Sequence, residues 1–212
     1  MEQAADDTGH ARPPPQYSDM STVVLFGKNS DFKKMIGNII IGNDIWNVQS
    51  FNGFTVEKNG TFKIVITPDF EESLDIHQEI IDLMALSHPD PSLFILAVDP
   101  EHSREEEVVA QIGKLQTMLG DHITGHLAVV THNVEIYYSL QRLKELFNIH
   151  LVSASENLPG DCQRWYSDRQ QFQFDYKHSR DLVMRRRKCL DSMSFRKDHP
   201  SQHGHVTAAV KL

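Results

Sequence analysis

Glycine and lysine residues gather in one short segment that follows an apolar run. The run TVVLFG (22–27) ends at Gly27, and Lys28, Lys33 and Lys34 follow it closely. Between a strand and a helix, such a segment can surround a phosphate with backbone amides while a lysine binds the phosphate oxygens. The candidate phosphate site is therefore the whole segment, made of Gly27, Lys28, Asn29, Ser30, Asp31, Phe32, Lys33, Lys34 and Met35.

The segment departs from a working phosphate loop at two positions. The pattern G-x-x-x-x-G-K-[ST] needs a second glycine for close approach of the backbone and a hydroxyl for Mg²⁺. Counted from Gly27, Phe32 replaces the second glycine, Lys33 is the lysine, and Lys34 replaces the hydroxyl residue. Lys34 cannot bind a cation and repels it, although its charge can attract a phosphate. The sequence therefore predicts a site that binds Mg²⁺ poorly.

Strands and helices alternate along the chain from residue 22 onward. Apolar runs typical of buried strands occupy 22–27, 93–98, 127–131 and 149–153, and helical spacing of apolar residues occupies 33–41, 73–86, 108–119 and 136–147. This alternation predicts an α/β fold whose mostly parallel sheet is covered on both faces. Ligands of such folds bind at the carboxyl ends of the strands, which is where the turn after Phe26 is expected to lie.

Two local signals refine this interpretation. Asn59-Gly60 joins the strand-like runs 51–57 and 61–67, which predicts an antiparallel hairpin at the edge of the sheet. Ser103 and Glu106 have the spacing of a capping box, which predicts a helix start. Residues 154–175 show little pattern, and 176–197 have the composition of a basic helix.

The segment VVLFGKNSDFKKMIGNIIIG (23–42) resembles the start of the AIG-type G domains, the GTPases of immunity-associated proteins. Those domains open with an apolar strand, continue with G-K-x-G-x-G-K-S and then with G-N-x-I-L-G. Here Gly27, Lys28, Lys33 and the run GNIIIG (37–42) stand at matching positions. Members from fish with degenerate loops look most similar.

The resemblance extends over residues 21–175 through three further segments, ITPD (66–69), LFILAVDPEHSREEE (93–107) and LAVVTHN (127–133). It implies a three-layer P-loop NTPase fold of the TRAFAC-type G domain, with a mostly parallel sheet and one antiparallel edge hairpin. It also implies GTP or GDP as the cofactor, with Gly27, Lys28 and Lys33 on the phosphates.

Two more motifs of the family are altered in this chain. The family's D-T-P-G is Ile66-Thr67-Pro68-Asp69, so an aspartate near Mg²⁺ is lost and a carboxylate stands near the expected γ-phosphate. After Thr131 the family has an arginine and then an acidic pair that binds the base. Here His132 and Glu135 are the residues that the resemblance assigns to the base.

Charge divides the chain into three parts. The formal net charge of the 212 residues is −8, of which residues 1–20 carry −3, residues 21–176 carry −11 and residues 177–212 carry +6. We expect a disordered leader (1–20), a G domain (21–175) and a basic helix or tail (176–212). With two cysteines and no apolar run near the roughly 20 residues of a membrane span, we expect a cytoplasmic protein.

Two functions remain open from the sequence. One is guanine-nucleotide binding with hydrolysis weak or absent, and the other is a nucleotide-free pseudo-GTPase that acts as an interaction module. For either, the resemblance implies a homo- or hetero-oligomer formed through the G-domain surface, and no nucleic-acid partner is expected.

The run Arg185-Arg186-Arg187-Lys188 is expected to be an exposed helix face that offers contact to an anionic membrane or an acidic partner, or to fold back on the acidic domain. Neither a catalytic residue nor a metal-ligand set is predicted.

Overall fold

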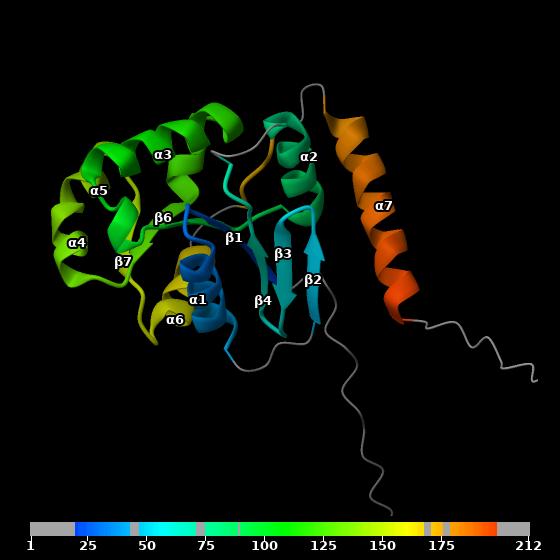
Figure 1. The fold of residues 1–212 in the computed structure, drawn as a ribbon, viewed down its shortest axis with the longest axis horizontal. Helices are drawn as coiled ribbons and strands as arrows, with labels where there is room; N and C mark the ends of the chain where they lie inside the picture. The colour runs from blue at the N-terminus through cyan, green and yellow to red at the C-terminus, as the bar shows by residue number, and fades with distance from the viewer. Residues whose placement is uncertain are drawn as a thin grey trace, which may run out of the picture.

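The computed structural model describes residues 20–42, 47–70, 75–88, 90–167, 171–175 and 179–198. Its centre is one seven-stranded sheet (Figure 1) with the order β2-β3-β4-β1-β5-β6-β7. The strands are β1 (Ser21–Phe26), β2 (Asn47–Phe51), β3 (Phe54–Lys58), β4 (Phe62–Ile66), β5 (Leu93–Ala97), β6 (Leu127–Thr131) and β7 (His150–Ser153). The five strands from β4 to β7 in this order pair in parallel, and β2 and β3 are antiparallel.

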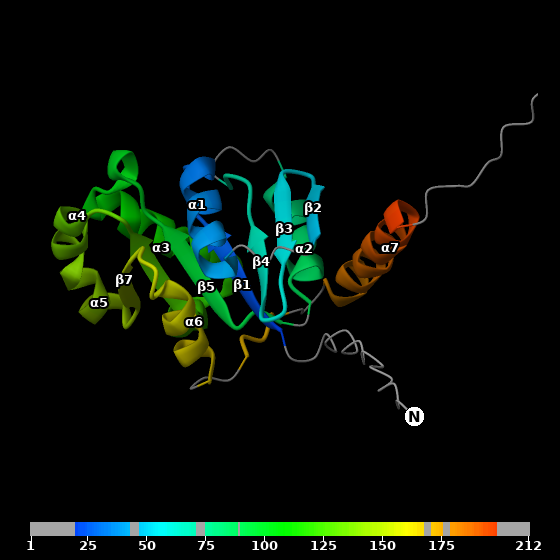
Figure 2. The same ribbon diagram turned by 90° about the horizontal axis from the view of Figure 1, so that it is seen from below.

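Helices cover both faces of the sheet and form the outer layers (Figure 2). Their bounds are α1 (Ser30–Ile41), α2 (Ile76–Leu86), α3 (Glu105–Leu119), α4 (Val134–Ser139), α5 (Gln141–Phe147), α6 (Leu158–Ser167) and α7 (Arg180–Asp198), with short 3₁₀ turns at Pro100–His102 and Asp121–His126. Helices α1 and α6 pack on one face, and α2, α3, α4 and α5 pack on the other. The predicted three-layer α/β fold is confirmed.

The central strands are buried on both faces, which explains their unbroken apolar runs. Alternate residues of β1 point to opposite layers, since Val23 and Leu25 pack with α1 while Val24 and Phe26 pack with the α2 and α3 layer. A strand that is buried on both faces needs no polar side chains for a solvent-facing side, so its sequence is apolar throughout. The same reasoning applies to β5 and β6, all of whose residues are buried.

Two antiparallel hairpins form the edge of the sheet. The predicted hairpin at Asn59-Gly60 is confirmed as the β3–β4 connection, in which Asn59 Oδ1 accepts from the amides of Thr61 and Phe62 at 2.8 and 2.6 Å. The prediction of a single strand over 51–57 is wrong. Asn52 and Gly53 both have positive φ, 45° and 82°, and they turn the chain between β2 and β3. This second Asn-Gly pair is the signal of a two-residue hairpin turn.

Three helix predictions need correction. The helix expected over 136–147 is divided at Leu140 into α4 and α5. The capping box is absent, because α3 begins after Arg104 with no side-chain cap, while Ser103 Oγ donates to the Pro100 carbonyl instead. Residues 154–175 contain helix α6, which has a rather polar surface, and the buried pair Phe172 and Phe174.

The basic helix predicted near the end of the chain is confirmed as α7, and it packs on α2. Arg186 donates to both carboxylate oxygens of Asp82, at 2.7 and 3.3 Å, and its guanidinium lies 4.4 Å from the centre of the Phe51 ring. Arg187 donates to the Met84 carbonyl at 3.4 Å. Two of the four consecutive basic residues therefore fold back on the domain, while Arg185 and Lys188 are exposed.

The predicted leader lies outside the described residues up to position 19, as do the chain from 199 onward and the side chains from 193. Within the described part of the chain, none of the helices combines the length and the apolar character that crossing a membrane requires.

Candidate functional site

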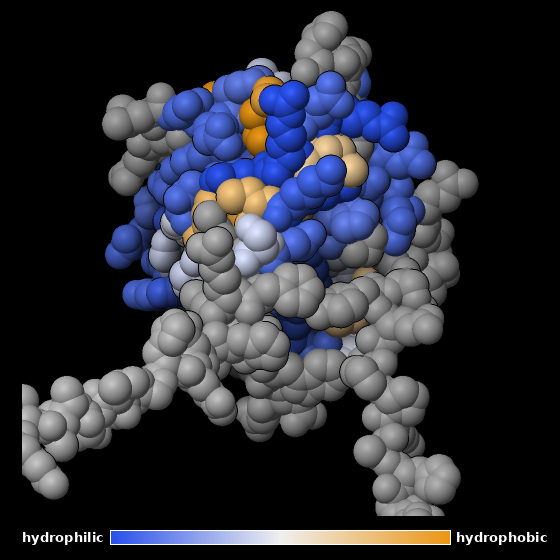
Figure 3. Space-filling model, turned by 90° about the vertical axis from the view of Figure 1, so that its right-hand side faces the viewer, coloured by the Kyte–Doolittle hydropathy of each residue, from blue (hydrophilic) through white to orange (hydrophobic). Residues whose placement is uncertain are grey.

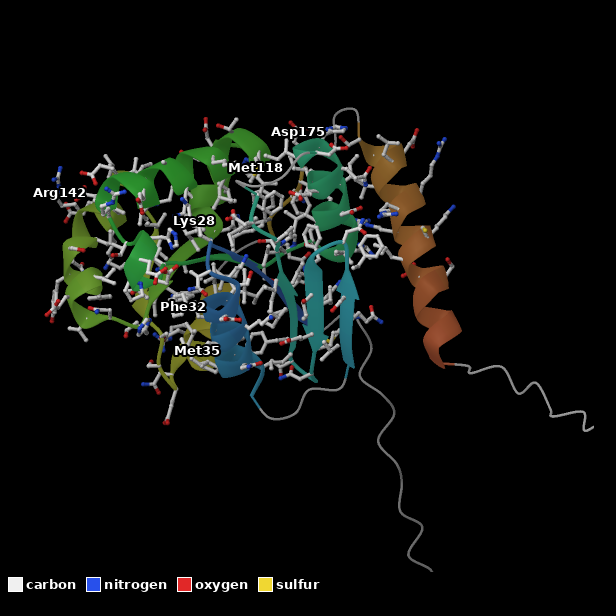
Figure 4. The ribbon with its side chains drawn as sticks, in the orientation of Figure 1. Lys28, Phe32, Met35, Met118, Arg142 and Asp175 are labelled. Carbon is white, nitrogen blue, oxygen red and sulfur yellow. The ribbon has the colours of Figure 1, made fainter. Side chains whose placement is uncertain are left out.

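The candidate site lies at the carboxyl ends of the parallel strands. The turn after β1, the loop 67–70 after β4, the loop after β5 and residues 132–133 between β6 and α4 all meet at this end of the sheet. Parallel pairing forces this meeting, because all these strands end on the same side of the sheet. Figure 4 shows Lys28 at this edge, between α1 and α3.

The turn between β1 and α1 contains only three residues, Gly27, Lys28 and Asn29. Gly27 has φ 139°, and a Cβ on this residue would lie 2.5 Å from the Ala97 carbonyl oxygen of β5. Glycine is therefore required for the passage past β5. Ser30, Asp31 and Phe32, which would belong to the loop of a phosphate-binding pattern, form the first turn of α1 instead.

Asn29 explains why the helix begins so early. Its side-chain oxygen accepts from the Phe32 amide at 2.9 Å, and its carbonyl accepts from the Lys33 amide at 3.1 Å. Asparagine is among the best residues at this capping position. Two amides that would face the ligand in a wide phosphate loop thus bind within the helix.

Phe32 packs toward the loop that follows β6. Its side chain is buried, and its ring centre lies 5.0 Å from that of His132 with the rings tilted by 57°. In Figure 4 Phe32 lies on the side of α1 that faces α4 and β7. The contact joins the phosphate turn to the segment that the resemblance assigns to the base.

Lys33 is fully buried, and its Nζ donates to the Thr67 carbonyl at 2.7 Å. Burial lowers the pKa of Lys33 to about 8, opposed by the nearby charge of Asp69. The lysine that the pattern assigns to phosphate is therefore bound to the backbone at the end of β4. To reach a phosphate it would have to leave this carbonyl.

The other basic residues of the segment face different neighbours. Lys34 is exposed, and its charge acts on Glu57 of β3, whose pKa burial raises and Lys34 lowers. Lys28 is half-buried, and its charge acts on Glu107 of α3. Ser30, Asp31 and Met35 are exposed on α1. The three lysines therefore do not converge on one point.

The altered D-T-P-G motif has a packing explanation. Ile66 is buried in the layer beneath α1, where its Cδ1 lies 3.5 Å from the position that a Cβ on Gly37 would occupy. Thr67 Oγ1 donates to the Leu25 carbonyl at 2.9 Å. An isoleucine at this place extends the apolar contact between β4 and α1, where an aspartate would place a charge.

The residues assigned to the base lie at the start of α4. His132 is exposed beside Phe32, and Asn133 caps α4 by accepting from the amides of Glu135 and Ile136 at 2.7 and 3.2 Å. The Glu135 side chain is exposed. The structure thus brings His132, but not Glu135, into contact with the phosphate segment among the described interactions.

One acidic residue at this edge was not singled out in the sequence. Asp99 follows β5 directly, is buried, and accepts from the Glu101 amide at 2.9 Å. Both of its carboxylate oxygens lie 3.1 Å from His102 Nδ1. The position of Asp99 directly after the apolar run 93–98 was the sequence signal that could have indicated it, because ligands of such folds bind at the carboxyl ends of the strands. Side-chain oxygens of Asp99 and Glu101 and a ring nitrogen of His102 lie within 4.8 Å of one another, but the hydrogen bonds of Asp99 already account for its position.

The pocket beside the turn is small and mainly apolar. It lies between the turn, the loop 67–70 and α3, and its volume is about 30 Å³. Pockets for small organic ligands usually measure about 300 Å³ or more. This pocket alone is therefore too small for a nucleotide, and Phe32, Lys33 and His132 do not line it.

Comparisons with known proteins agree with the architecture. No known family profile matches the chain, and no curated protein matches it. The cytosolic domain of the T. maritima FeoB iron transporter in a GDP form has a TM-score of 0.50 and 15% identity, over 89% of this chain and 77% of that one. The G domain of the same transporter has a TM-score of 0.49 and 14% identity, over 70% of this chain and 98% of that one. A putative nucleolar GTP-binding protein 1 from Plasmodium falciparum has a TM-score of 0.45 and 15% identity, over 87% of this chain and 95% of that one. The chain has the fold of a G domain, as predicted.

Proposed function

We infer that the chain is a nucleotide-free pseudo-GTPase of the AIG type, a G domain that neither binds nor hydrolyses GTP and that works by associating with other proteins. The observation that carries this proposal is the three-residue turn between β1 and α1. A phosphate loop works by presenting several backbone amides around the phosphates. Here the residues that would do so are helical and capped by Asn29.

The remaining parts of phosphoryl-transfer chemistry are weakened in the same direction. Catalysis of this reaction depends on positioning and on charge stabilisation by Mg²⁺ and a lysine. Lys34 stands where a metal-binding hydroxyl is needed, Ile66 stands where an aspartate is needed, and Lys33 is bound to the Thr67 carbonyl. Each change removes an interaction with the metal or the phosphates, so together they favour an inactive site.

An exposed apolar surface on α4 and α5 supports the interaction role. Val134 and Tyr138 lie one helical turn apart on α4, with exposed fractions of 62% and 68%, and Leu146 of α5 is also 68% exposed. Exposed apolar side chains on one helix face, as Val134 and Tyr138 are, often mark protein contacts. The partner we propose is a second G domain, either another copy of this chain or a relative.

Guanine-nucleotide binding is the second candidate, at the same edge of the sheet. It is favoured by the contact between Phe32 and His132, which holds the phosphate segment next to the segment assigned to the base. In this alternative GTP or GDP contacts Lys28 and His132 without Mg²⁺, after Lys33 leaves the Thr67 carbonyl. A relative in fold is described in a GDP form, which is a property of that protein.

Calorimetric titration with GTP, GDP and ATP, each with and without Mg²⁺, separates the two candidates. The pseudo-GTPase proposal predicts no saturable heat at millimolar nucleotide. Saturable binding of GTP or GDP but not of ATP would favour the second candidate.

Sedimentation velocity over a range of protein concentrations tests the association surface. Val134→Asp is expected to shift the protein toward monomer, because it places a charge in the proposed contact. Leu182→Asp is the matched control, since Leu182 is an exposed aliphatic residue on α7, away from the surface. Equal behaviour of both variants and the parent chain would contradict this surface.

A further inference from the structure

A second pocket lies at the amino ends of the parallel strands, whereas the candidate site lies at their carboxyl ends. It has a volume of about 290 Å³, and its walls come from the loop after α2, from residue 171 and from α7. His88 and Asp90 belong to the loop that leads into β5, so they lie at the amino end of that strand. The pocket is therefore separate from the turn at Gly27, and it is large enough for a small organic ligand.

One face of α7 supplies the longer wall of this pocket. Arg180, Val183, Met184 and Arg187 line it, and their spacing of three, four and seven residues places them on one face of a helix. Two arginines thus border the same space, two helical turns apart, and the Arg187 guanidinium also donates to the Met84 carbonyl at 3.4 Å. Figure 3 views the molecule from the side on which α7 lies and shows a mostly hydrophilic surface with a few apolar side chains.

Two further titratable residues, Lys63 and His88, lie at or close to the pocket. Lys63 of β4 is buried, and its Nζ donates to the His88 carbonyl at 2.7 Å, so it holds the loop that forms the other wall. Burial first, and then the charges of Lys58 and Arg187, lower the pKa of Lys63 to about 7, opposed by Asp191. The pKa of His88 is lowered by burial and then by Arg187 and Lys63, opposed by Asp90 and Asp191.

Arg187 thus helps to lower the pKa of both Lys63 and His88, so it disfavours the protonated form of each. Asp90 is the one acidic side chain that lines the pocket among the described residues. Arginine binds phosphate oxygens with two parallel hydrogen bonds, and such charge-assisted bonds are stronger than neutral ones. An anion in the pocket would favour the protonated forms of Lys63 and His88 and would bridge α7 and His88.

We propose that this pocket binds a phosphate monoester through Arg180 and Arg187 of α7, with His88 on the opposite wall. The volume leaves room for a small organic group beside the phosphate. The same chemistry is offered by a soluble sugar or polyol phosphate and by the headgroup of a phosphoinositide. The proposal stands apart from the function of the turn at Gly27, because the two sites share no residue.

Calorimetric titration of the full chain with glycerol phosphate, in a buffer free of phosphate and nucleotide, tests the proposal. We expect saturable binding that Arg180→Gln weakens about tenfold or more, since this exposed residue can be replaced without disturbing the core. Arg185→Gln is the matched control, as it removes the same charge from an exposed position of α7 outside the pocket. Lys28→Gln controls for binding at the other edge. Both controls should retain the parent affinity.

Absence of saturable binding, or equal affinity of Arg180→Gln and the parent chain, would overturn the proposal. Phosphatidylcholine vesicles with and without a phosphoinositide form the second arm. Phosphoinositide-dependent binding that is lost in Arg180→Gln and kept in Arg185→Gln identifies a lipid headgroup as the source of the phosphate. Equal loss in both variants would reflect general attraction of a basic helix to an anionic surface, and would contradict the pocket.

Discussion

At the scale of single residues, the account depends on Lys33 and Phe32, the two residues of α1 that face inward from the turn. Lys33 donates to the Thr67 carbonyl, and Phe32 packs on His132. Both side chains are held by the protein itself, so the groups that a nucleotide would meet are already engaged.

The lowered pKa of Lys33 predicts how stability depends on pH. Folding shifts this pKa from 10.5 to about 8, so between these values the unfolded chain binds more protons and stability rises with pH. The unfavourable contribution of Lys33 is full below pH 8 and is lost as the pH approaches 10.5. At about 1.4 kcal/mol for each pKa unit, the change amounts to at most about 3 to 4 kcal/mol.

Urea unfolding of the parent chain and of Lys33→Met between pH 7 and 10 checks this prediction. The free energy of unfolding of the parent chain should increase relative to that of Lys33→Met as the pH rises through this window. Comparing the two proteins at each pH removes the contributions of other groups, including Lys63. A constant difference between the two free energies of unfolding across the window would show that folding does not lower the pKa of Lys33.

Restoring the phosphate-loop residues tests whether residue type or turn length limits the site. The double variant Phe32→Gly with Lys34→Ser supplies the missing glycine and hydroxyl. We expect no gain in GTP affinity, because Asn29 still begins the helix three residues after β1. Loss of the buried ring should also lower stability by about 3 kcal/mol or more. A clear gain in affinity by titration would show that the turn opens once Phe32 is removed.

The sequence predicted the chemical content of this segment but not its geometry. Gly27, Lys33 and the missing glycine at Phe32 were visible in the pattern. The early helix start depends on Asn29, whose capping role was encoded but competed with the interpretation of the segment as a loop. The contact between Phe32 and His132 joins residues 100 positions apart, and no local rule reports it.

At the scale of elements, the contact between α7 and α2 is the least expected feature. Asp82 is buried and accepts from Arg186, from Gln78 at 3.0 Å and from Asn52 at 3.2 Å. The carboxylate thereby connects α2, the β2–β3 turn and α7. Because Asn52 lies in the hairpin turn, this network also sets the position of the sheet edge.

A double-mutant cycle on Arg186 and Asp82 measures this connection. Arg186→Met leaves a buried carboxylate without its charged partner, which typically costs about 3 kcal/mol or more. The double variant with Asp82→Asn should be destabilised by clearly less than the sum of the single changes, with a coupling of about 1 kcal/mol or more. Urea unfolding supplies each free energy, and Arg185→Met should stay within about 0.5 kcal/mol of the parent chain. Strict additivity would mean that α7 does not dock through this pair.

The central strands were predictable from their apolar runs, because they are buried on both faces, whereas the edge strands β2 and β3 were not separated. Helix α6 and the pair Phe172 and Phe174 were not, since the polar residues around them hide the few that are buried. The docking of α7 was only one of several readings, because four consecutive basic residues indicate an exposed face. Only the partners in space, Asp82 and the Met84 carbonyl, show which two turn inward.

At the scale of the whole molecule, the two edges of the sheet carry different chemistry. The carboxyl ends of the strands carry the short turn at the position of a G-domain ligand site. The amino ends of the strands carry the basic pocket beside α7. The net charge of −8 describes neither edge. An acidic domain with a basic helix folded against it can still attract an anion locally, because short-range charges decide binding at a pocket.

Thermal unfolding with millimolar Mg²⁺–GTP, Mg²⁺–GDP or GTP alone is the most direct test of the pseudo-GTPase account. A ligand at 100 times its Kd stabilises the native state by about 2.7 kcal/mol, which shifts the midpoint by several degrees. Mg²⁺–ATP at the same concentration serves as the control for general effects of a triphosphate. The account predicts the same midpoint for the guanine nucleotides as for the nucleotide-free protein and the ATP control. A guanine-specific increase, with or without Mg²⁺, would contradict it.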